Sequence, residues 1–218
     1  MNKSGAESEE SINIEYGVRY DDGQFSGEII AFESDYDNLL GRCRASDSDC
    51  QVGQEFSGGN VEVSGVEVFG QFQRSLSGGV ILASQLNYTF SESKFRGAFF
   101  SQFSQWGLVE KGDELPYIPR HAGRWQVGLE TDIWAIDVAL KYQHGMREVP
   151  GSGQIADDLH TDSLTTLDAS LTWFVNEQMD LRVLTRNLTD ETAIVSHRPY
   201  GARPNFPRTL MAQMKYRF

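Results

Sequence analysis

The chain has 218 residues, of which 39 % are hydrophobic and 23 % charged, and its formal net charge is -12. This acidity argues against nucleic acid as a partner, because phosphates require clustered lysine and arginine. No stretch approaches the roughly 18–20 consecutive apolar residues of a membrane-spanning helix. Low hydropathy does not exclude a transmembrane barrel, since only alternate residues of a barrel strand need to be apolar.

Apolar and polar residues alternate along the first part of the chain, which predicts strands with one apolar face. In the first run this face carries Ile12, Ile14, Tyr16, Val18 and Tyr20. Asp21-Asp22-Gly23 then predicts a tight hairpin turn, because Asp-Gly tolerates positive φ. A second strand is expected over about 24–36. Its phase is irregular, and we expect a β-bulge there.

Seven further strands follow with the same alternation. Their apolar faces hold, in chain order, Val66, Val68, Gly70 and Phe72; Val80, Leu82, Leu86, Tyr88 and Phe90; Trp125, Val127 and Leu129; Trp134, Ile136, Val138, Leu140 and Tyr142; Leu167, Ala169, Leu171 and Trp173; Leu181 and Val183; and Leu210, Ala212, Met214, Tyr216 and Phe218.

The links between these strands alternate in length. Short links follow the first, third, fifth and seventh strands, whereas long segments follow the others, over about 38–59, 91–119, 146–163 and 190–206. Outer-membrane barrels show this asymmetry, with short periplasmic turns and long extracellular loops. A soluble β-sandwich would also alternate, with its apolar face packed inward. The barrel is favoured because the apolar faces lack charge and end in aromatic residues, as at membrane interfaces.

The predicted fold is therefore an all-β antiparallel transmembrane meander of about nine strands. Nine is odd, whereas bacterial single-chain barrels use an even number. Residues 1–10 are polar and acidic and do not form a signal peptide. We expect residues 1–218 to be the C-terminal segment of a larger barrel.

The two cysteines, Cys43 and Cys50, lie in one polar segment. Their spacing is compatible with a small loop disulfide in an oxidising compartment. A metal site is not expected there, because two thiols without a nearby histidine supply too few ligands.

Several motifs resemble those of TonB-dependent outer-membrane receptors, in order and over nearly the whole chain. They are residues 15–20 with 31–32 and 35–36, 65–67, 115–121, the element Arg186-Asn187-Leu188-Thr189-Asp190-Glu191, and the closing strand 207–218. Thr189 stands where the family usually has phenylalanine. Within the family, residues 197–204 together with the paired cysteines are most similar to the ferric citrate receptor branch.

The resemblance implies a 22-stranded barrel in the cell outer membrane, with outer-membrane lipid around it. It also implies active import of a ferric chelate, energised through TonB by an N-terminal plug and TonB box that this chain lacks. In the closing strand, Tyr216 and Phe218 would be the signal read by the barrel-assembly machinery.

Ligand contacts are expected from arginine, whose guanidinium pairs bidentately with the carboxylates of an anionic chelate. Arg198 and Arg203 lie in one proline-stiffened loop with Tyr200 between them, and Arg120, His121 and Arg147 are further candidates. The same arginines could instead tie the loop to neighbouring acidic loops.

No catalytic constellation, metal site or cofactor is predicted, because the four histidines are scattered and no nucleophile elbow occurs. A passive barrel, such as a porin or a translocation unit without TonB coupling, is the alternative function. An upstream plug and TonB box would discriminate the importer from it.

Overall fold

The computed structural model describes residues 8–43, 51–101, 106–155, 159–198 and 201–218. Its main element is one nine-stranded antiparallel sheet in the order β1-β2-β5-β6-β9-β10-β11-β12-β15. These strands are β1 Glu10–Asp21, β2 Phe25–Asp37, β5 Val61–Ser75, β6 Ile81–Phe95, β9 His121–Glu130, β10 Trp134–Gln143, β11 Leu164–Asn176, β12 Met179–Arg186 and β15 Thr209–Tyr216. The all-β antiparallel meander predicted from the alternation is confirmed, and a second layer facing the sheet, as in a sandwich, is not formed by the described residues.

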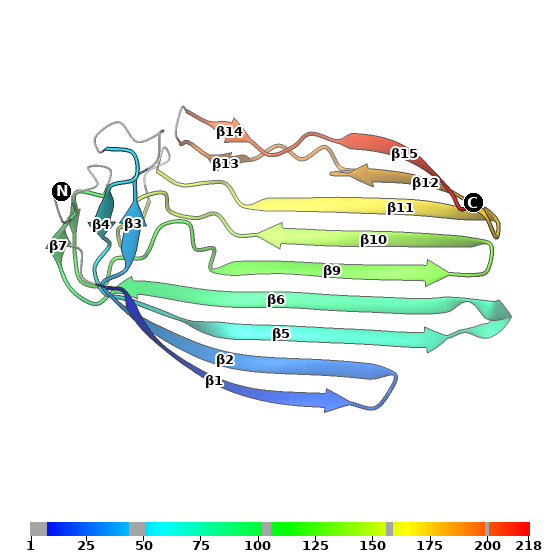
Figure 1. Ribbon diagram of the computed structural model, residues 1–218, viewed down its shortest axis with the longest axis horizontal. Helices are drawn as coiled ribbons and strands as arrows, with labels where there is room; N and C mark the ends of the chain where they lie inside the picture. The colour runs from blue at the N-terminus through cyan, green and yellow to red at the C-terminus, as the bar shows by residue number, and fades with distance from the viewer. Residues whose placement is uncertain (1–7, 44–50, 102–105, 156–158, 199–200) are drawn as a thin grey trace.

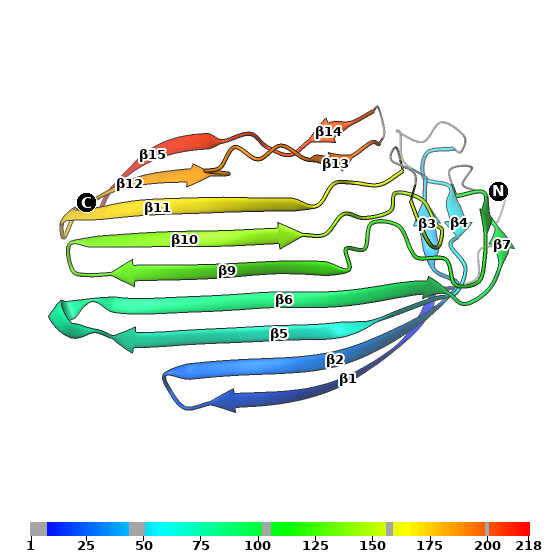
Figure 2. The ribbon, with the colours of Figure 1, turned by 180° about the vertical axis from the view of Figure 1, so that it is seen from behind.

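Six short strands and one 3-10 turn complete the described structure. They are β3 Leu40–Arg42, β4 Glu55–Ser57, β7 Phe99–Phe100, β8 Leu108–Val109, β13 Ile194–Ser196, β14 Arg203–Pro204 and η1 Ser77–Gly79. The short strands pair as β3-β4, β7-β8 and β13-β14 within the long segments. All three hairpins lie at one end of the sheet, and the short turns lie at the other (Figures 1 and 2).

The strand registers place all the predicted apolar runs on one face, which we call the apolar face. Val68, for example, pairs with Ile29 and Tyr88, and Val138 pairs with Val127 and Ala169. Because side chains of directly paired residues point to the same side, the alternation of each strand is continued across its neighbours. The opposite side, the polar face, carries residues such as Gln85 and Asp137.

The bulge expected in the second strand is not formed. The register of β2 runs without a shift against both β1 and β5, so Ile30 and Phe32 lie on the polar face. The reason is glycine across the strand: Phe32 pairs with Gly65, and a Cβ at Gly65 would meet the Phe32 ring. An aromatic side chain that covers a cross-strand glycine replaces packing that the glycine cannot supply. The one recorded shift in the nine-stranded sheet lies at Phe174/Asn176, next to the β11–β12 turn.

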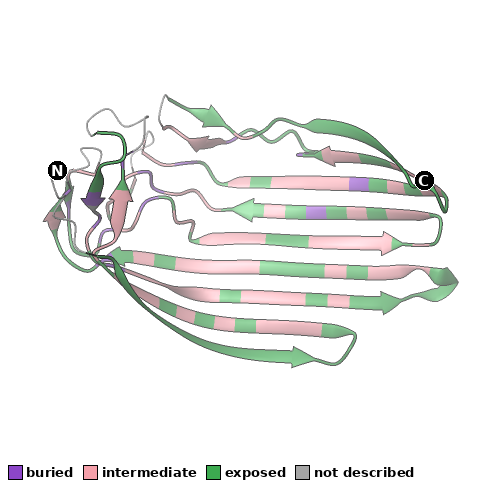
Figure 3. Cartoon of the chain, in the orientation of Figure 1, coloured by how far each residue is buried: buried purple, intermediate pink, exposed green. Residues whose placement is uncertain are grey.

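Buried side chains are concentrated at the hairpin end, with few along the sheet (Figure 3). Val61, Phe95 and Val109 form the apolar cluster, and Trp106 and Leu115 pack against it. On the apolar face, in contrast, Leu171 and Met214 are half exposed or more. The sheet does not close, because β1 and β15 each pair on one side only. Among the described residues no α-helix is long and apolar enough to cross a membrane.

Candidate functional site

The predicted ligand-binding residues that the structure describes lie at the hairpin end of the sheet or at its border. Arg203 belongs to β14, which pairs with β13 so that Arg203 faces Ser196. Arg198 follows β13, where its backbone N–H donates to Ser196 Oγ at 3.0 Å. Tyr200, predicted between the two arginines, lies outside the described residues. The structure therefore brings Arg198 and Arg203 onto one hairpin, which we call the β13–β14 loop.

Neither arginine of this loop has an ion-pair or hydrogen-bond partner for its guanidinium group among the residues that the structure describes. Arg208, just before β15, pairs with Asp190 at 3.4 Å, and Arg96 pairs with Asp35 at 2.9 Å. A guanidinium group presents five donors in a planar fork suited to carboxylates. Arg198 and Arg203 thus retain donors that a ligand could use.

A buried glutamate holds the β13–β14 loop against the neighbouring long segment. The carboxylate of Glu148, only 2 % exposed, accepts hydrogen bonds from the His197 N–H at 2.9 Å, from Ser196 Oγ at 3.2 Å and from Tyr117 Oη at 3.2 Å. The His197 ring Nδ1 lies 2.7 Å from its second oxygen. Burial raises the pKa of Glu148, but these hydrogen bonds, led by the His197 N–H, outweigh burial and place the pKa below its usual value. The carboxylate is therefore charged and fixes the base of the loop.

Arg120 already has a partner at the same end of the sheet. Its guanidinium lies 2.7 Å from Glu114 Oε1, and the buried Arg147 lies 2.8 Å from Glu114 Oε2. Arg147 also donates to the Gly153 carbonyl oxygen. Glu114 thus bridges two arginines, and a chelate would have to compete with it for Arg120. The ligand role of Arg120 stays a prediction.

His121 lies on the apolar face, in register with Phe90. Its Nδ1 is 2.7 Å from the Tyr88 hydroxyl, and its ring is 5.2 Å from the Phe90 ring and 5.8 Å from the His144 ring. This aromatic group is at the hairpin end of the face, where an interfacial girdle is expected. The structure gives His121 these contacts, and its ligand role stays a prediction.

The Arg186–Glu191 motif acts as a corner that joins the last two long strands. Asn187, at φ 50° and buried, donates to the carbonyls of Glu191 and Phe206 and accepts from the Glu191 N–H. Asp190 accepts from the Arg208 N–H at 3.0 Å. These contacts fasten both ends of the segment that carries the β13–β14 loop. The motif was identified by its resemblance to the family, and the structure shows that its hydrogen bonds fix the two ends of this segment.

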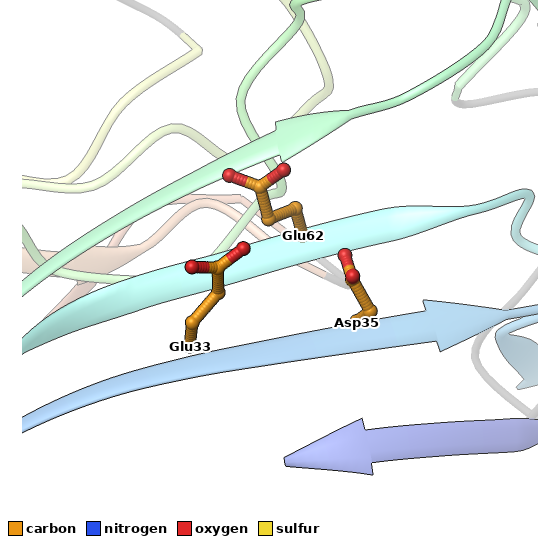
Figure 4. A group of neighbouring side chains, drawn as sticks. All are labelled: Glu33, Asp35 and Glu62. Atoms are coloured by element: carbon orange, nitrogen blue, oxygen red, sulfur yellow. The ribbon is translucent and has the colours of Figure 1, made fainter. Parts of the chain in front are cut away.

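Sequence reasoning missed a group of carboxylates on the apolar-face side beyond the apolar band, Glu33, Asp35 and Glu62 (Figure 4). Their ligand atoms lie within 4.8 Å of one another. Lys94 pairs with Glu62 at 2.5 Å, and Arg96 pairs with Asp35, so basic side chains offset two of the charges. The spacing of Glu33 and Asp35, two residues apart on one strand, was the available signal. The expectation of an uncharged apolar face was wrong at this end, because the strands continue past the apolar band.

The disulfide and the insertion signal remain predictions. Cys43 is buried, with its N–H donating to the Gln54 carbonyl and its own carbonyl accepting from Gly53, whereas Cys50 lies outside the described residues. At the other end of the chain, the Tyr216 and Phe218 rings meet at 5.2 Å in an edge-on arrangement, and Phe218 is fully exposed.

Known proteins resemble this chain in sequence pattern and in fold. Residues 2–188 match the family model described as TonB dependent receptor-like, beta-barrel. No curated protein sequence matches the chain. The ferric yersiniabactin uptake receptor FyuA from Yersinia pestis is 21 % identical with a TM-score of 0.69, covering 96 % of this chain and 30 % of its own. The ferric-catecholate import receptor Fiu from K12 E. coli is 19 % identical with a TM-score of 0.70, and the match covers 100 % of this chain and 29 % of Fiu.

The ferric citrate transporter FecA is also similar, at 17 % identity and a TM-score of 0.67, covering 95 % of this chain and 31 % of its own. Its identity is no higher than that of FyuA or Fiu, so these likenesses do not favour the ferric citrate branch. At such identities they concern the fold, and the chain spans less than a third of each receptor. The family model covers 187 of the 218 residues, and the structure has the antiparallel meander predicted for a barrel segment. The chain therefore belongs to the TonB-dependent receptor β-barrel family.

Proposed function

We propose that this chain forms part of the barrel wall of an outer-membrane receptor that imports a ferric chelate, either a siderophore or ferric citrate, with energy supplied through TonB. One observation carries the chelate assignment. A barrel sheet of this family presents, at its hairpin end, the two arginines 198 and 203 without an acidic partner among the described residues. The ferric chelates named for FyuA, Fiu and FecA support the same class of cargo.

Arg198 and Arg203 would bind carboxylate or other anionic oxygens of the chelate. Glu148 would hold the backbone of the β13–β14 loop while leaving both guanidinium groups available, so that the donors are positioned before the ligand arrives. Tyr200, which lies between the two arginines in sequence, is a secondary candidate. Arg120 and its sequence neighbour His121 are two more. Ordering donors in advance reduces the entropy lost on binding.

The apolar face would contact outer-membrane lipid. Its half-exposed valines and leucines and its terminal aromatic residues fit the lipid band and interfacial girdles of such barrels. The barrel-assembly machinery would read Tyr216 and Phe218. TonB would act through parts of the receptor other than the described strands and hairpins.

The test compares two double variants of the full-length receptor. Arg198→Ala/Arg203→Ala should weaken binding of ferric citrate and of ferric siderophores by at least about tenfold, since hydrogen bonds to charged groups contribute roughly 1.5–3 kcal/mol each. Arg42→Ala/Lys111→Ala is the matched control, because both are exposed cations of other long segments. Binding is measured by tryptophan quenching on the purified receptor, and uptake in strains with and without TonB.

Equal affinity of both double variants would remove Arg198 and Arg203 from the site. Uptake that persists without TonB would contradict the energised receptor and support a passive barrel.

A further inference from the structure

The apolar face carries a hollow of about 470 Å³ near the β1–β2 turn. It is lined by Val18, Tyr20, Phe25, Gly70, Leu86 and Trp125, among others, from β1, β2, β5, β6 and β9. Tyr20 and Trp125 are more than half exposed, so the walls are open to whatever surrounds the face. We call this hollow the apolar groove.

Two glycines create the groove. Gly27 of β2 pairs directly with Gly70 of β5, so no side chain rises from either position on this face. The Phe25 ring lies over Gly27, where a Cβ would come within 2.9 Å of it, and beside Gly70, where a Cβ would stay 3.7 Å away. Tyr20 packs beside Phe25, with ring centroids 6.2 Å apart. The result is an aromatic-walled slot on the apolar face.

A cation and an anion stand at the turn end of this slot. Arg74 follows Phe72 by two residues on β5 and therefore points to the same face. It is exposed and has no ion-pair partner among the residues with described positions. The Gln73 N–H donates to the Gln24 carbonyl at 2.9 Å, which brings Arg74 beside the β1–β2 turn.

The anion is Asp22, in that turn. Its Oδ1 accepts from the Phe25 and Gln24 N–H groups, and its Oδ2 accepts from the Tyr20 hydroxyl at 3.3 Å. The Phe25 N–H, followed by the Gln24 N–H, lowers the pKa of Asp22. The Tyr20 ring thus connects the wall of the groove to a fixed negative charge at its mouth.

We infer that the groove binds one glycerophospholipid with a zwitterionic, primary-ammonium headgroup, phosphatidylethanolamine being the simplest case. One acyl chain lies against the Phe25 ring and over Gly70, the phosphate pairs with Arg74, and the ammonium donates to Asp22. The inference rests on the proposed membrane setting. Charge complementarity selects this lipid: phosphatidylglycerol offers no cation for Asp22, and the quaternary ammonium of phosphatidylcholine has no N–H to donate.

The experiment measures lipid retained by the full-length receptor in native mass spectrometry, after exchange into detergent with phosphatidylethanolamine, phosphatidylglycerol or phosphatidylcholine. One copy of phosphatidylethanolamine should be retained about fivefold more than either other lipid, because charge-assisted hydrogen bonds are about twice as strong as neutral ones. Equal retention of the three lipids would overturn the inference.

Two variants separate headgroup from chain. Arg74→Gln should remove the preference for phosphatidylethanolamine, and Gly70→Val should lower retention of all three lipids by filling the floor of the groove. The controls are Lys215→Gln, which removes a cation on the polar face, and Gly123→Val, which fills a glycine elsewhere on the apolar face and meets only ordinary contacts.

Wild-type retention and preference in Arg74→Gln, or reduced retention in both controls, would contradict the site. Arg74 is exposed and packs against no core, so this variant decides the question even if Gly70→Val does not fold. A heat-modifiable band in electrophoresis shows folding for each variant. Chelate binding is measured separately on the same preparations, so failure of the lipid site and failure of the receptor assignment are distinguishable.

Discussion

The sheet and the hairpin end are stabilised in different ways. Along the sheet, strands are joined by continuous backbone ladders, while side chains such as Val138 and Leu171 remain 39 % and 50 % exposed. At the hairpin end, Phe95 is 1 % exposed, and charged groups such as Glu148 and Arg147 are buried as well. The apolar face of the sheet therefore has no protein interior to cover it among the described residues, whereas the hairpin end supplies its own interior.

In the proposed receptor, this difference would separate two roles within one barrel segment. A wall that meets lipid needs an apolar exterior, and lipid contributes no hydrogen bonds to its backbone. Loops that hold a ligand in water need a fixed shape without lipid, and the Val61–Phe95–Val109 cluster and the Glu148 hydrogen bonds provide one. Mutations at the hairpin end and mutations in the sheet should therefore show their effects in different assays.

The largest effect is expected from emptying the hairpin-end cluster. Phe95→Ala should destabilise this end by about 3–5 kcal/mol, the usual cost of removing a buried aromatic ring. The Phe95 ring contacts Phe99 and Trp106, each with centroids 5.7 Å away. Hydrogen exchange of amides in 106–119 should accelerate, while the heat-modifiable band of the barrel stays.

Phe100→Ala is the matched control, because Phe100 neighbours Phe99 but is 77 % exposed. Similar exchange in the two variants, or loss of the folded band in Phe95→Ala alone, would show that the two regions are not independent.

A charge in the middle of the apolar face should damage the wall instead. Val138→Arg should cost about 2–4 kcal/mol, as for arginine at the midplane of a lipid-facing strand. Gln85→Arg places the same side chain on the polar face, between Gln71 and Gln126, and should be close to neutral. Urea unfolding in lipid vesicles compares the two, and equal destabilisation would contradict the assignment of the faces.

The strands could be predicted because the period-two alternation of each strand shows which of its residues lie on the apolar face. An exposed apolar face needs no specific protein partner, so Val68 or Met214 can be placed from its own strand alone. The β-bulge in β2 was predicted wrongly because Ile30 and Phe32 are apolar residues that lie on the polar face. They lie across from Gly17 and Gly65, and cross-strand glycines are visible only once the register is known.

The candidate site was less predictable, because its parts meet across long sequence separations. Glu148 and His197 are 49 residues apart, and Arg147 and Glu114 are 33 apart. Sequence placed Arg198 and Arg203 in one loop, since they are close in the chain. It could not show that Arg120 is paired with Glu114, or that a glutamate from another segment holds the loop base.

The smallest expected effect tests that base. Glu148→Gln keeps the shape of the side chain but removes its charge, and should cost about 1–3 kcal/mol of loop docking, since hydrogen bonds to charged groups are weakened. The His197 and Ile194 amides should exchange faster, with barrel assembly unchanged.

The same contact should depend on pH. Because the folded pKa of Glu148 is lowered, its contribution to loop docking is complete above the unfolded pKa of about 4.3 and is lost as pH falls through the folded pKa. Wild-type protection should therefore decline on acidification and approach that of Glu148→Gln. Glu110→Gln, an exposed carboxylate in another segment, is the control and should keep both the wild-type protection and its pH dependence. Identical protection of Glu148→Gln and wild type at neutral pH would mean that the β13–β14 loop is held by other contacts, and the ordered-loop part of the binding proposal would fall with it.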